Sequence, residues 1–244
     1  MTQNITAILN ILLYTGIFSH LLPLAFFLLF KRKNKEKVLR VIVFYISYCI
    51  VNEAISFYLQ SQRSPNTIVL FALYTIIEYS LFCYFFYLIL PKTNVKKIVP
   101  YVWVGFVLFA FIDLFYINKM AGFDSFAIGI ESIIIIIFCI YYLYLQIKSA
   151  NDLMIYSTFN FWIIITFLIY FAGTFFLYIM TENMVYDVAF QKLYFIINIS
   201  FNILKNILLS VAMTMKVNNS ADTLKVPAPP NLDDDIFFKP NNYR

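Results

Sequence analysis

Long apolar runs separated by short polar clusters make up most of the chain. An α-helix needs about 20 mostly apolar residues to cross a bilayer. Seven stretches reach this length: roughly 5–30, 39–60, 66–90, 97–118, 123–147, 153–180 and 189–214. The pattern predicts an all-α fold, a polytopic membrane bundle of seven transmembrane helices over residues 1–217. Residues 218–244 contain few large apolar side chains and several Pro and Asp, so we expect a disordered tail there.

Basic residues are unevenly divided among the loops. The first, third and fifth loops hold six, three and one Lys or Arg, whereas the even connections hold only Arg63, Lys119 and Lys192. Cytoplasmic loops carry an excess of Lys and Arg. The charge pattern therefore predicts that the N-terminus lies outside and that the C-terminus is cytoplasmic.

Composition agrees with a lipid environment. Hydrophobic residues make up 62% of the chain and charged residues 13%, whereas a soluble domain carries about 25% charged residues. The net charge of +5 does not indicate nucleic-acid binding, because the basic residues lie between apolar runs, where they anchor spans. We expect a multi-pass protein of the cell membrane, in a bacterium the inner membrane, with the lipid bilayer as its main partner and no nucleic acid.

The spans contain few helix breakers. The chain has only five glycines, and Pro23 is the one proline well inside a span. Secondary transporters often break helices at their binding sites, with Gly or Pro in matching positions of two halves. That pattern is absent here, which favours a bundle of continuous helices.

Several ionisable and amide side chains fall inside the apolar runs. Each ionisable group costs about 2.5–3.5 kcal/mol on insertion scales, so such groups are candidates for a ligand or ion pathway. At a rise of 1.5 Å per residue, they fall into two layers. The layer nearer the outside contains Glu53, Asp113, Glu131 and Asn198. The deeper layer contains His20, Glu78, Asn202 and Lys205.

Two spans also carry polar stripes at helical spacing. In the last span Asn198, Asn202 and Asn206 are four residues apart. The second span has a stripe near helical spacing, made of Tyr45, Tyr48, Cys49, Asn52, Ser56 and Gln60. Residues four apart lie on one face of a helix. Because lipid cannot satisfy polar side chains, both stripes are expected to face other helices or a wet cavity. The spacing does not tell whether they face each other.

Lys205 is the most constrained of these groups. It lies too deep to reach the inner interface easily, so it needs an anion or must lose its proton. Glu78 is the best partner by depth, either as a structural pair or as a charge switch or counter-ion for a ligand. Glu53, Asp113 and Glu131 cannot all stay ionised if they are adjacent. A proton, a cation or an amine would then compensate, unless each forms a separate hydrogen bond between helices.

Chemical motifs are scarce. His20 is the one histidine, the three cysteines lack metal-ligand spacing, and no hydrolase or phosphate-binding motif occurs, so we expect neither a metal site nor an enzyme. Lys205 in the last span and Glu78 in the third resemble the retinal-binding rhodopsins, which would imply retinal on Lys205. The sixth span lacks that family's Trp–Pro arrangement, and Phe201 stands where an acidic residue would precede the lysine. No cofactor is therefore expected.

Three roles fit these observations. The first is a receptor-like or sensory protein that binds a small ligand in an outward-opening polar cavity and signals to a cytoplasmic partner through residues 218–244. The second is an ion- or proton-coupled transporter that uses the intramembrane carboxylates. The third is a non-catalytic membrane subunit of a larger complex.

Overall fold

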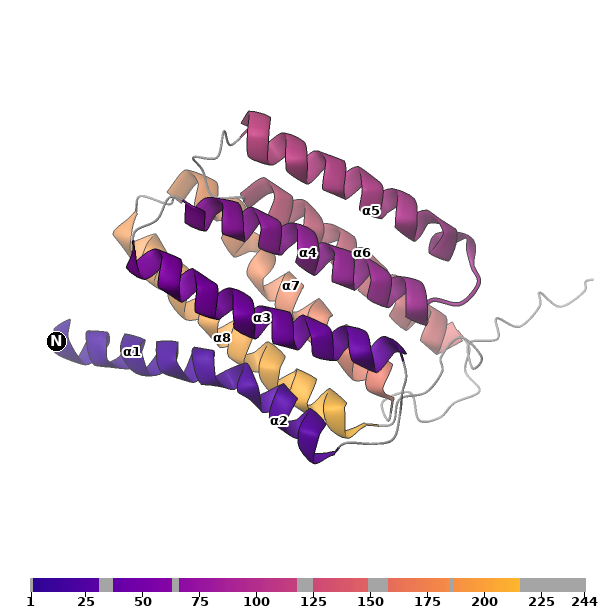
Figure 1. Cartoon of the computed structure of the whole chain (residues 1–244), viewed down its shortest axis with the longest axis horizontal. Coiled ribbons are helices and arrows are strands. Elements are labelled where there is room, and N and C mark those ends of the chain that lie inside the picture. The colour runs from indigo at the N-terminus through magenta and orange to yellow at the C-terminus, as the bar shows by residue number, and fades with distance from the viewer. Residues whose placement is uncertain are drawn as a thin grey trace, which may run out of the picture.

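The computed structural model describes residues 2–30, 37–62, 66–117, 125–148, 158–184 and 187–215 (Figure 1). These residues are nearly all helical, and they contain seven helical segments long and apolar enough to cross a membrane. The spans are Ile11–Leu29, Lys37–Ser61, Val69–Ile89, Asn94–Tyr116, Phe126–Lys148, Phe159–Met180 and Ala189–Thr214. The predicted all-α bundle of seven transmembrane helices is confirmed. The predicted tail over 218–244 lies outside the described residues.

Nine helical elements form these seven spans in the described part of the chain. They are α1 (Thr2–Ser19), α2 (Leu21–Leu29), α3 (Lys37–Ser61), α4 (Asn66–Ile89), α5 (Asn94–Ile112), the π-helical turn η1 (Asp113–Ile117), α6 (Ser125–Lys148), α7 (Phe159–Met184) and α8 (Val188–Thr214). Three of the described helix starts are capped by side chains. Thr93 Oγ1 accepts a hydrogen bond from the Lys96 amide, Thr158 Oγ1 accepts one from the Phe161 amide, and the Asp187 carboxylate accepts one from the Ala189 amide at 2.8 Å. Such caps satisfy amides that the first turn leaves without helical partners.

The first span is not continuous. Helix α1 ends at Ser19, α2 begins at Leu21, and His20 lies between them. Pro23 explains the break, because proline has no amide hydrogen and its ring clashes with the carbonyl four residues earlier, here that of Ser19. The expectation of continuous helices is therefore wrong for this span. A single proline interrupts this span. The break does not require Gly or Pro in matching positions of two halves, as described above for transporters.

The last helix holds the bundle together. Helix α8 packs against α7 on one side and against α1 and α2 on the other, and α7 packs against α6. Helix α4 contacts α3, α5 and α6, while α5 lies at the edge of the bundle (Figure 1). The C-terminal helix thus closes the bundle against the N-terminal span.

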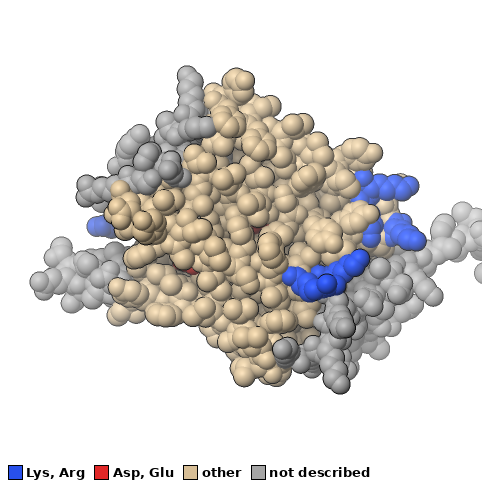
Figure 2. Space-filling model, in the orientation of Figure 1, with Lys and Arg blue, Asp and Glu red and all other residues tan. Residues whose placement is uncertain are grey.

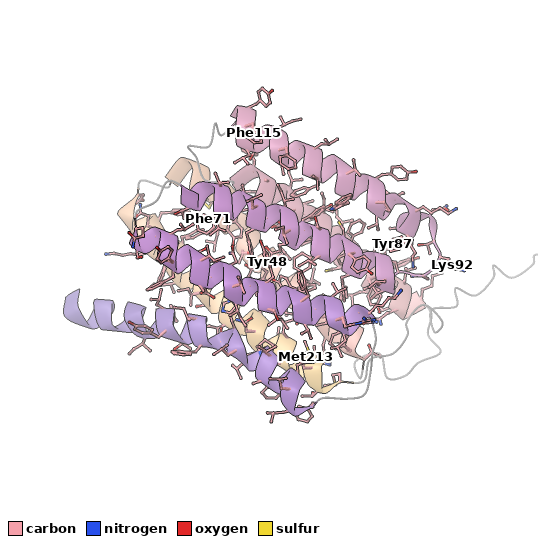
Figure 3. All side chains as sticks on the ribbon, in the orientation of Figure 1. Tyr48, Phe71, Tyr87, Lys92, Phe115 and Met213 are labelled. Atoms are coloured by element: carbon pink, nitrogen blue, oxygen red, sulfur yellow. The ribbon has the colours of Figure 1, made fainter. Side chains whose placement is uncertain are left out.

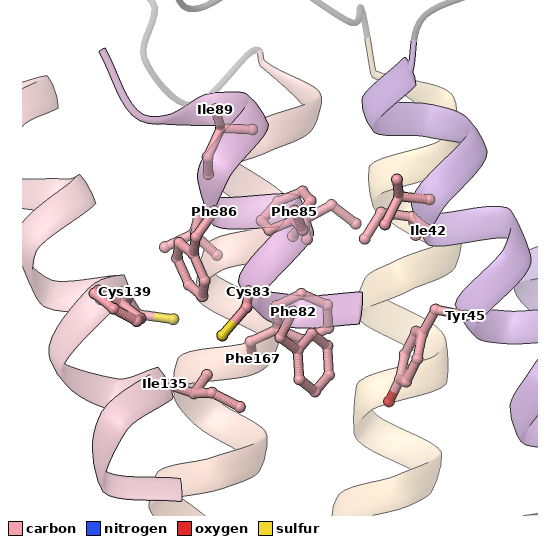
Figure 4. Packing of buried hydrophobic residues seen from close by; sticks show 14 of the residues in the cluster. Ile42, Tyr45, Phe82, Cys83, Phe85, Phe86, Ile89, Ile135, Cys139 and Phe167 are labelled. Carbon is pink, nitrogen blue, oxygen red and sulfur yellow. The ribbon is translucent and has the colours of Figure 1, made fainter. Parts of the chain in front are cut away.

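Aromatic rings fill one half of the bundle. Phe82 of α4 contacts Tyr45 of α3 and Phe167 of α7, with ring centroids 5.0 Å and 4.5 Å apart. Figure 4 shows these rings interlocking with Phe85 and Phe86, next to the aliphatic side chains around them. Tilted and edge-on ring contacts of this kind are favourable, and rigid rings leave few voids. This half is a tightly packed apolar core.

The two ends of the bundle differ in charge. Lys and Arg gather mainly at one end of the molecule in Figure 2, and Lys92 marks the same end in Figure 3. We call it the basic end; its described members are Lys37, Arg40, Lys92, Lys96, Lys97 and Lys148. Lys192, in the first turn of α8, belongs to the opposite end. The orientation in the membrane stays a prediction that follows from this asymmetry.

The close approach of α7 and α8 leads to a first prediction. A Cβ placed on Gly173 would overlap the ring of Phe201, whereas a Cβ on Gly105 of α5 would meet nothing. Gly173→Ala should therefore lower the free energy of unfolding by about 1–3 kcal/mol, as overpacking does. The measurement is an unfolding titration in mixed micelles.

Two comparisons isolate the cause. Gly105→Ala should leave stability unchanged or raise it slightly, because alanine favours helix more than glycine does. In a Phe201→Ala background the penalty of Gly173→Ala should nearly vanish. Equal penalties in both backgrounds would show that the ring does not set this helix spacing.

Candidate functional site

A cavity of about 450 Å³ occupies the half of the bundle away from the basic end. Its wall is built by α1 with His20, and by α3, α4, α6, α7 and α8. Phe71, which lies on this wall, is labelled in Figure 3 at the opposite end from Lys92. The volume lies within the range of about 300–1,000 Å³ that small-molecule sites occupy.

The cavity ends abruptly on the apolar core. On each of five helices, a buried core residue lies within four positions of the wall residue nearest the basic end. These pairs are Cys49 and Tyr45, Glu78 and Phe82, Glu131 and Ile135, Tyr170 and Phe167, and Lys205 and Leu209. Contacts among Tyr45, Glu78, Tyr170 and Lys205 bring the boundaries on α3, α4, α7 and α8 together, and we call this meeting point the floor of the cavity.

Seven of the eight residues predicted for a ligand or ion pathway line this cavity. They are His20, Glu53, Glu78, Glu131, Asn198, Asn202 and Lys205. Asp113 does not belong to it: this residue is fully buried where α5 passes into η1, and no described residue of α5 reaches the wall. Depth along a span placed Asp113 level with Glu53 and Glu131, but it could not show that α5 lies at the edge of the bundle.

Lys205 and Glu78 are joined through a tyrosine. Lys205 Nζ donates to the Tyr45 hydroxyl at 3.2 Å, and that hydroxyl donates to Glu78 Oε1 at 2.9 Å. The two side chains are 3% and 5% exposed, and they do not form a direct ion pair. Glu78 was the expected partner by depth, yet the structure inserts Tyr45 between the charges. A hydroxyl can both accept and donate, so it satisfies both groups at once.

Further contacts complete this floor. The Tyr74 hydroxyl also donates to Glu78 Oε1 at 2.9 Å, and it lies 3.5 Å from Cys49 Sγ. The Lys205 ammonium lies 4.3 Å from the centroid of the Tyr170 ring. A desolvated cation over a tyrosine ring is worth about 2 kcal/mol. Helices α3, α4, α7 and α8 thus meet at one charged and hydrogen-bonded floor.

The helix break places a second ion pair on the wall. His20 Nδ1 lies 2.9 Å from Glu53 Oε2 and 3.1 Å from the Gly16 carbonyl oxygen. His20 lies between α1 and α2, and its side chain contacts Glu53 of α3. The Glu53 side chain remains 38% exposed, so this pair is wetter than the one at the floor.

The polar stripes of α3 and α8 line the same cavity. On α8, Asn198 Oδ1 accepts from the Tyr178 hydroxyl at 3.3 Å and from Asn202 Nδ2 at 3.2 Å. Asn206, deeper in the bundle, donates to Ser19 Oγ at 2.8 Å. The stripes therefore share a cavity, which their spacing alone could not establish.

Most of the individual tyrosines of the site were missed by sequence reasoning. The pattern placed Tyr45 and Tyr48 on the stripe of the second span, but it did not single out Tyr74, Tyr170, Tyr178 and Tyr194, which line the cavity. Tyr45 carried a usable signal, because it lies four residues before Cys49 and seven before Asn52 on the polar stripe of α3. The other tyrosines had no such neighbours in their own spans.

The fold and the cavity define a class: a polytopic helical membrane protein with a polar and aromatic cavity inside the bundle. Within the described ranges, no three His, Cys, Asp or Glu side chains are grouped as metal ligands. Comparison with models of known protein families, with curated proteins and with solved structures finds no match to this chain. Function is therefore argued from the cavity.

The tyrosine between the two charges leads to a second prediction. Tyr45→Phe should lower the free energy of unfolding by about 1–3 kcal/mol, because Lys205 loses its acceptor and Glu78 loses one of its donors. Tyr79→Phe is the matched control, since Tyr79 is equally buried and its hydroxyl makes no hydrogen bond to a charged group among the described residues. Unfolding titrations of both variants compare them. Equal effects of the two substitutions would show that the Tyr45 hydroxyl does not stabilise the fold by bridging Lys205 and Glu78.

Proposed function

We propose that the chain is a membrane receptor that binds a small molecule in its internal cavity. The observation that carries this proposal is a cavity of ligand-binding size, with polar and aromatic walls, whose floor of Lys205, Tyr45 and Glu78 lies next to the apolar core. Small-molecule sites commonly combine apolar and aromatic walls with a few convergent polar groups. A ligand that enters from the end opposite the basic end would stay on that side.

The floor offers a way to pass on the signal. A ligand in the cavity touches Lys205, Glu78 and the tyrosines that surround them, and these groups join α3, α4 and α8. A ligand that binds one arrangement of these helices more tightly than another shifts their equilibrium. Helix α8 leads toward residues 218–244, the segment that we propose docks on a cytoplasmic partner.

The receptor proposal is tested by filling the cavity. Ser56 lies on the wall, so Ser56→Trp would place an indole inside it. Leu108→Trp is the matched control, because Leu108 of α5 is 59% exposed on the outer surface of the bundle. The proteins are purified from native membranes in a mild detergent, and their bound small molecules are extracted and identified by mass spectrometry.

The proposal predicts a small molecule that co-purifies with the wild type and with Leu108→Trp. Its amount should fall at least tenfold in Ser56→Trp, provided that this variant elutes like the wild type in gel filtration. If no small molecule depends on the cavity, then the bundle is not a receptor of this kind.

A proton-coupled transporter is the second candidate, and one observation favours it. Transporters place broken helices at their binding sites, and the break between α1 and α2 puts His20 on the cavity wall. The contacting pair His20 and Glu53, and the chain of hydrogen bonds from Lys205 through Tyr45 to Glu78, could then take up and release protons. This function requires the apolar core next to the floor to open during each cycle.

Flux separates the two candidates. A transporter would carry protons into sealed liposomes that contain a pH-sensitive dye, and Glu78→Gln or Lys205→Met would stop this flux. For the receptor we expect no flux above that of empty liposomes in the wild type. The exposed variant Leu108→Trp serves as the control for protein insertion.

A further inference from the structure

We propose that the cavity opens sideways to the bilayer between α1 and α3, and that its ligand is a single-chain amphiphile with an uncharged hydroxyl headgroup. The ligand enters from the membrane, and its headgroup reaches the contact between His20 and Glu53. This inference rests on the receptor proposed above and names the class of its ligand. It is carried by the exposure of the cavity wall, the packing of α1 and the depth of the opening.

The exposed part of the cavity wall lies on one edge of α3. Phe57 lines the cavity and is 67% exposed, Gln60 lines it and is exposed as well, and the Glu53 side chain is 38% exposed. The remaining wall residues are buried or partly buried. These three residues are spaced four and three positions apart, so they lie on one face of the helix. A wall residue that is also exposed marks the mouth of a cavity, and this mouth therefore runs along α3.

Helix α1 and the residue after it form the opposite edge of the mouth. Leu13, Ile17 and His20 line the cavity, and they too are spaced four and three positions apart. The chain runs toward the basic end in α1 and away from it in α3, so the two edges are antiparallel. The contact of 2.9 Å between His20 Nδ1 and Glu53 Oε2 sets their register. The two exposed wall residues of α3 then lie at the levels of Ile17 and Leu13.

The two edges are not packed together beyond this contact. Helix α1 packs against α8 and α2, and α2 packs against α3, but among the described helices α1 and α3 have no extended packing with each other. Helix α1 accordingly lies at the periphery of the bundle (Figure 1). The mouth is thus closed on the side of the basic end, where α2 meets α3, and it is open along the turns that precede His20 in α1.

The mouth lies at the level of the hydrocarbon. Its residues fall inside two membrane spans, Ile11–Leu29 and Lys37–Ser61. The large side chains beside it are exposed, with Tyr14 and Phe18 on α1 and Tyr58 on α3. Exposed apolar and aromatic surface on a helix of membrane-spanning length faces lipid chains. A molecule that passes between the two edges therefore comes from the bilayer.

The mouth has partners for both parts of an amphiphile. Leu13, Ile17 and Phe57 offer apolar surface to a chain. The Glu53 carboxylate contacts His20 and stays partly exposed. A carboxylate has two acceptor oxygens, so it can accept a further hydrogen bond from a hydroxyl group. The cavity of about 450 Å³ has the size of a site for a small molecule, which favours one chain over two.

Depth favours an uncharged headgroup. From Ile11, where the span begins, to His20 the helix rises by about 14 Å at 1.5 Å per residue. Bringing a charged group to this depth through hydrocarbon costs far more than bringing a hydroxyl group. A carboxylate headgroup would also be repelled by Glu53, because like charges disfavour each other. Fatty alcohols and monoacylglycerols combine the required chain and headgroup.

A photoreactive monoacylglycerol tests the route and the ligand class together. A monoacylglycerol with a diazirine in its chain is added to the purified full chain in phosphatidylcholine nanodiscs, and the labelled peptides are identified by mass spectrometry. We expect most of the label on the two edges of the mouth and on the cavity wall. Monoolein should reduce this labelling at least fivefold. Methyl oleate, which lacks the hydroxyl groups, and oleate, which is charged, should reduce it less than twofold.

Neighbouring substitutions on α1 separate the mouth from the lipid-facing surface. Leu13→Trp would place an indole at the mouth, whereas Tyr14→Trp would place it on the exposed side of the same helix. Labelling of the cavity wall should fall at least fivefold in Leu13→Trp and stay unchanged in Tyr14→Trp. If Leu13→Trp does not elute like the wild type in gel filtration, Ile17→Trp takes its place. Equal labelling in all variants would overturn the route.

A third substitution tests the headgroup contact. Glu53→Leu removes the acceptor at the mouth and should abolish the preference for monoolein over methyl oleate, while the chain still enters. An unchanged preference in this variant would refute the assignment of the headgroup to Glu53.

The outcomes separate this inference from the receptor proposal. Label spread evenly over the exposed faces of the bundle, α5 included, or label that monoolein does not reduce, overturns the amphiphile and its route. The cavity can still bind a water-soluble molecule in that case, and the extraction from native membranes with Ser56→Trp decides this question by itself. Loss of both results would refute both proposals.

Discussion

The interior of this bundle is organised by the need to satisfy one lysine that cannot reach water. Lys205 is nearly fully buried on α8, and a lone ammonium ion in a medium of low dielectric would be prohibitively unstable. Groups from three other helices stabilise this ammonium ion: the Tyr45 hydroxyl, the Tyr170 ring and, beyond Tyr45, the Glu78 carboxylate. These contacts fix where α3, α4, α7 and α8 meet, and the level at which they meet is the floor of the cavity.

The same constraint divides the bundle into two halves. Lipid cannot satisfy polar side chains, so those of α3 and α8 turn inward on the side of Glu78 that faces away from the basic end. Beyond that level most buried side chains are apolar, and rings such as Phe82 and Phe167 pack edge to face, although Asn160 and Gln146 are buried there as well. The helices that line the cavity therefore change from polar wall to mainly apolar core, and the described bundle has one half with the cavity and one packed half.

Hydropathy predicted the seven spans because their length is set by the bilayer, and spacing predicted depth because a helix rises by a fixed amount per residue. Neither hydropathy nor spacing shows which helices lie next to one another. Asp113 shares the depth of Glu131 but sits on the peripheral α5, away from the cavity. Tyr45 was placed on the stripe of the second span, but its bridging role could not be predicted, because it depends on Glu78 and Lys205, which are distant in sequence. The break at His20 was missed because Pro23 was weighed only as half of a pair.

The broken first span and the buried lysine act on the same helix. Ile199 of α8 packs against Gly16, and Asn206 Nδ2 of α8 donates a hydrogen bond to Ser19 Oγ at the end of α1. A ligand that displaces His20 from Glu53 would therefore shift the contacts between α1 and α8. The same ligand would also contact Lys205 at the floor of the cavity. The two proposed functions differ in what they require of the aromatic core next to that floor. A transporter requires this core to open, whereas a receptor requires it to stay packed. Because this core is fully buried and closely packed, movement of α8 without opening of a path is the response that requires the smaller loss of apolar contact.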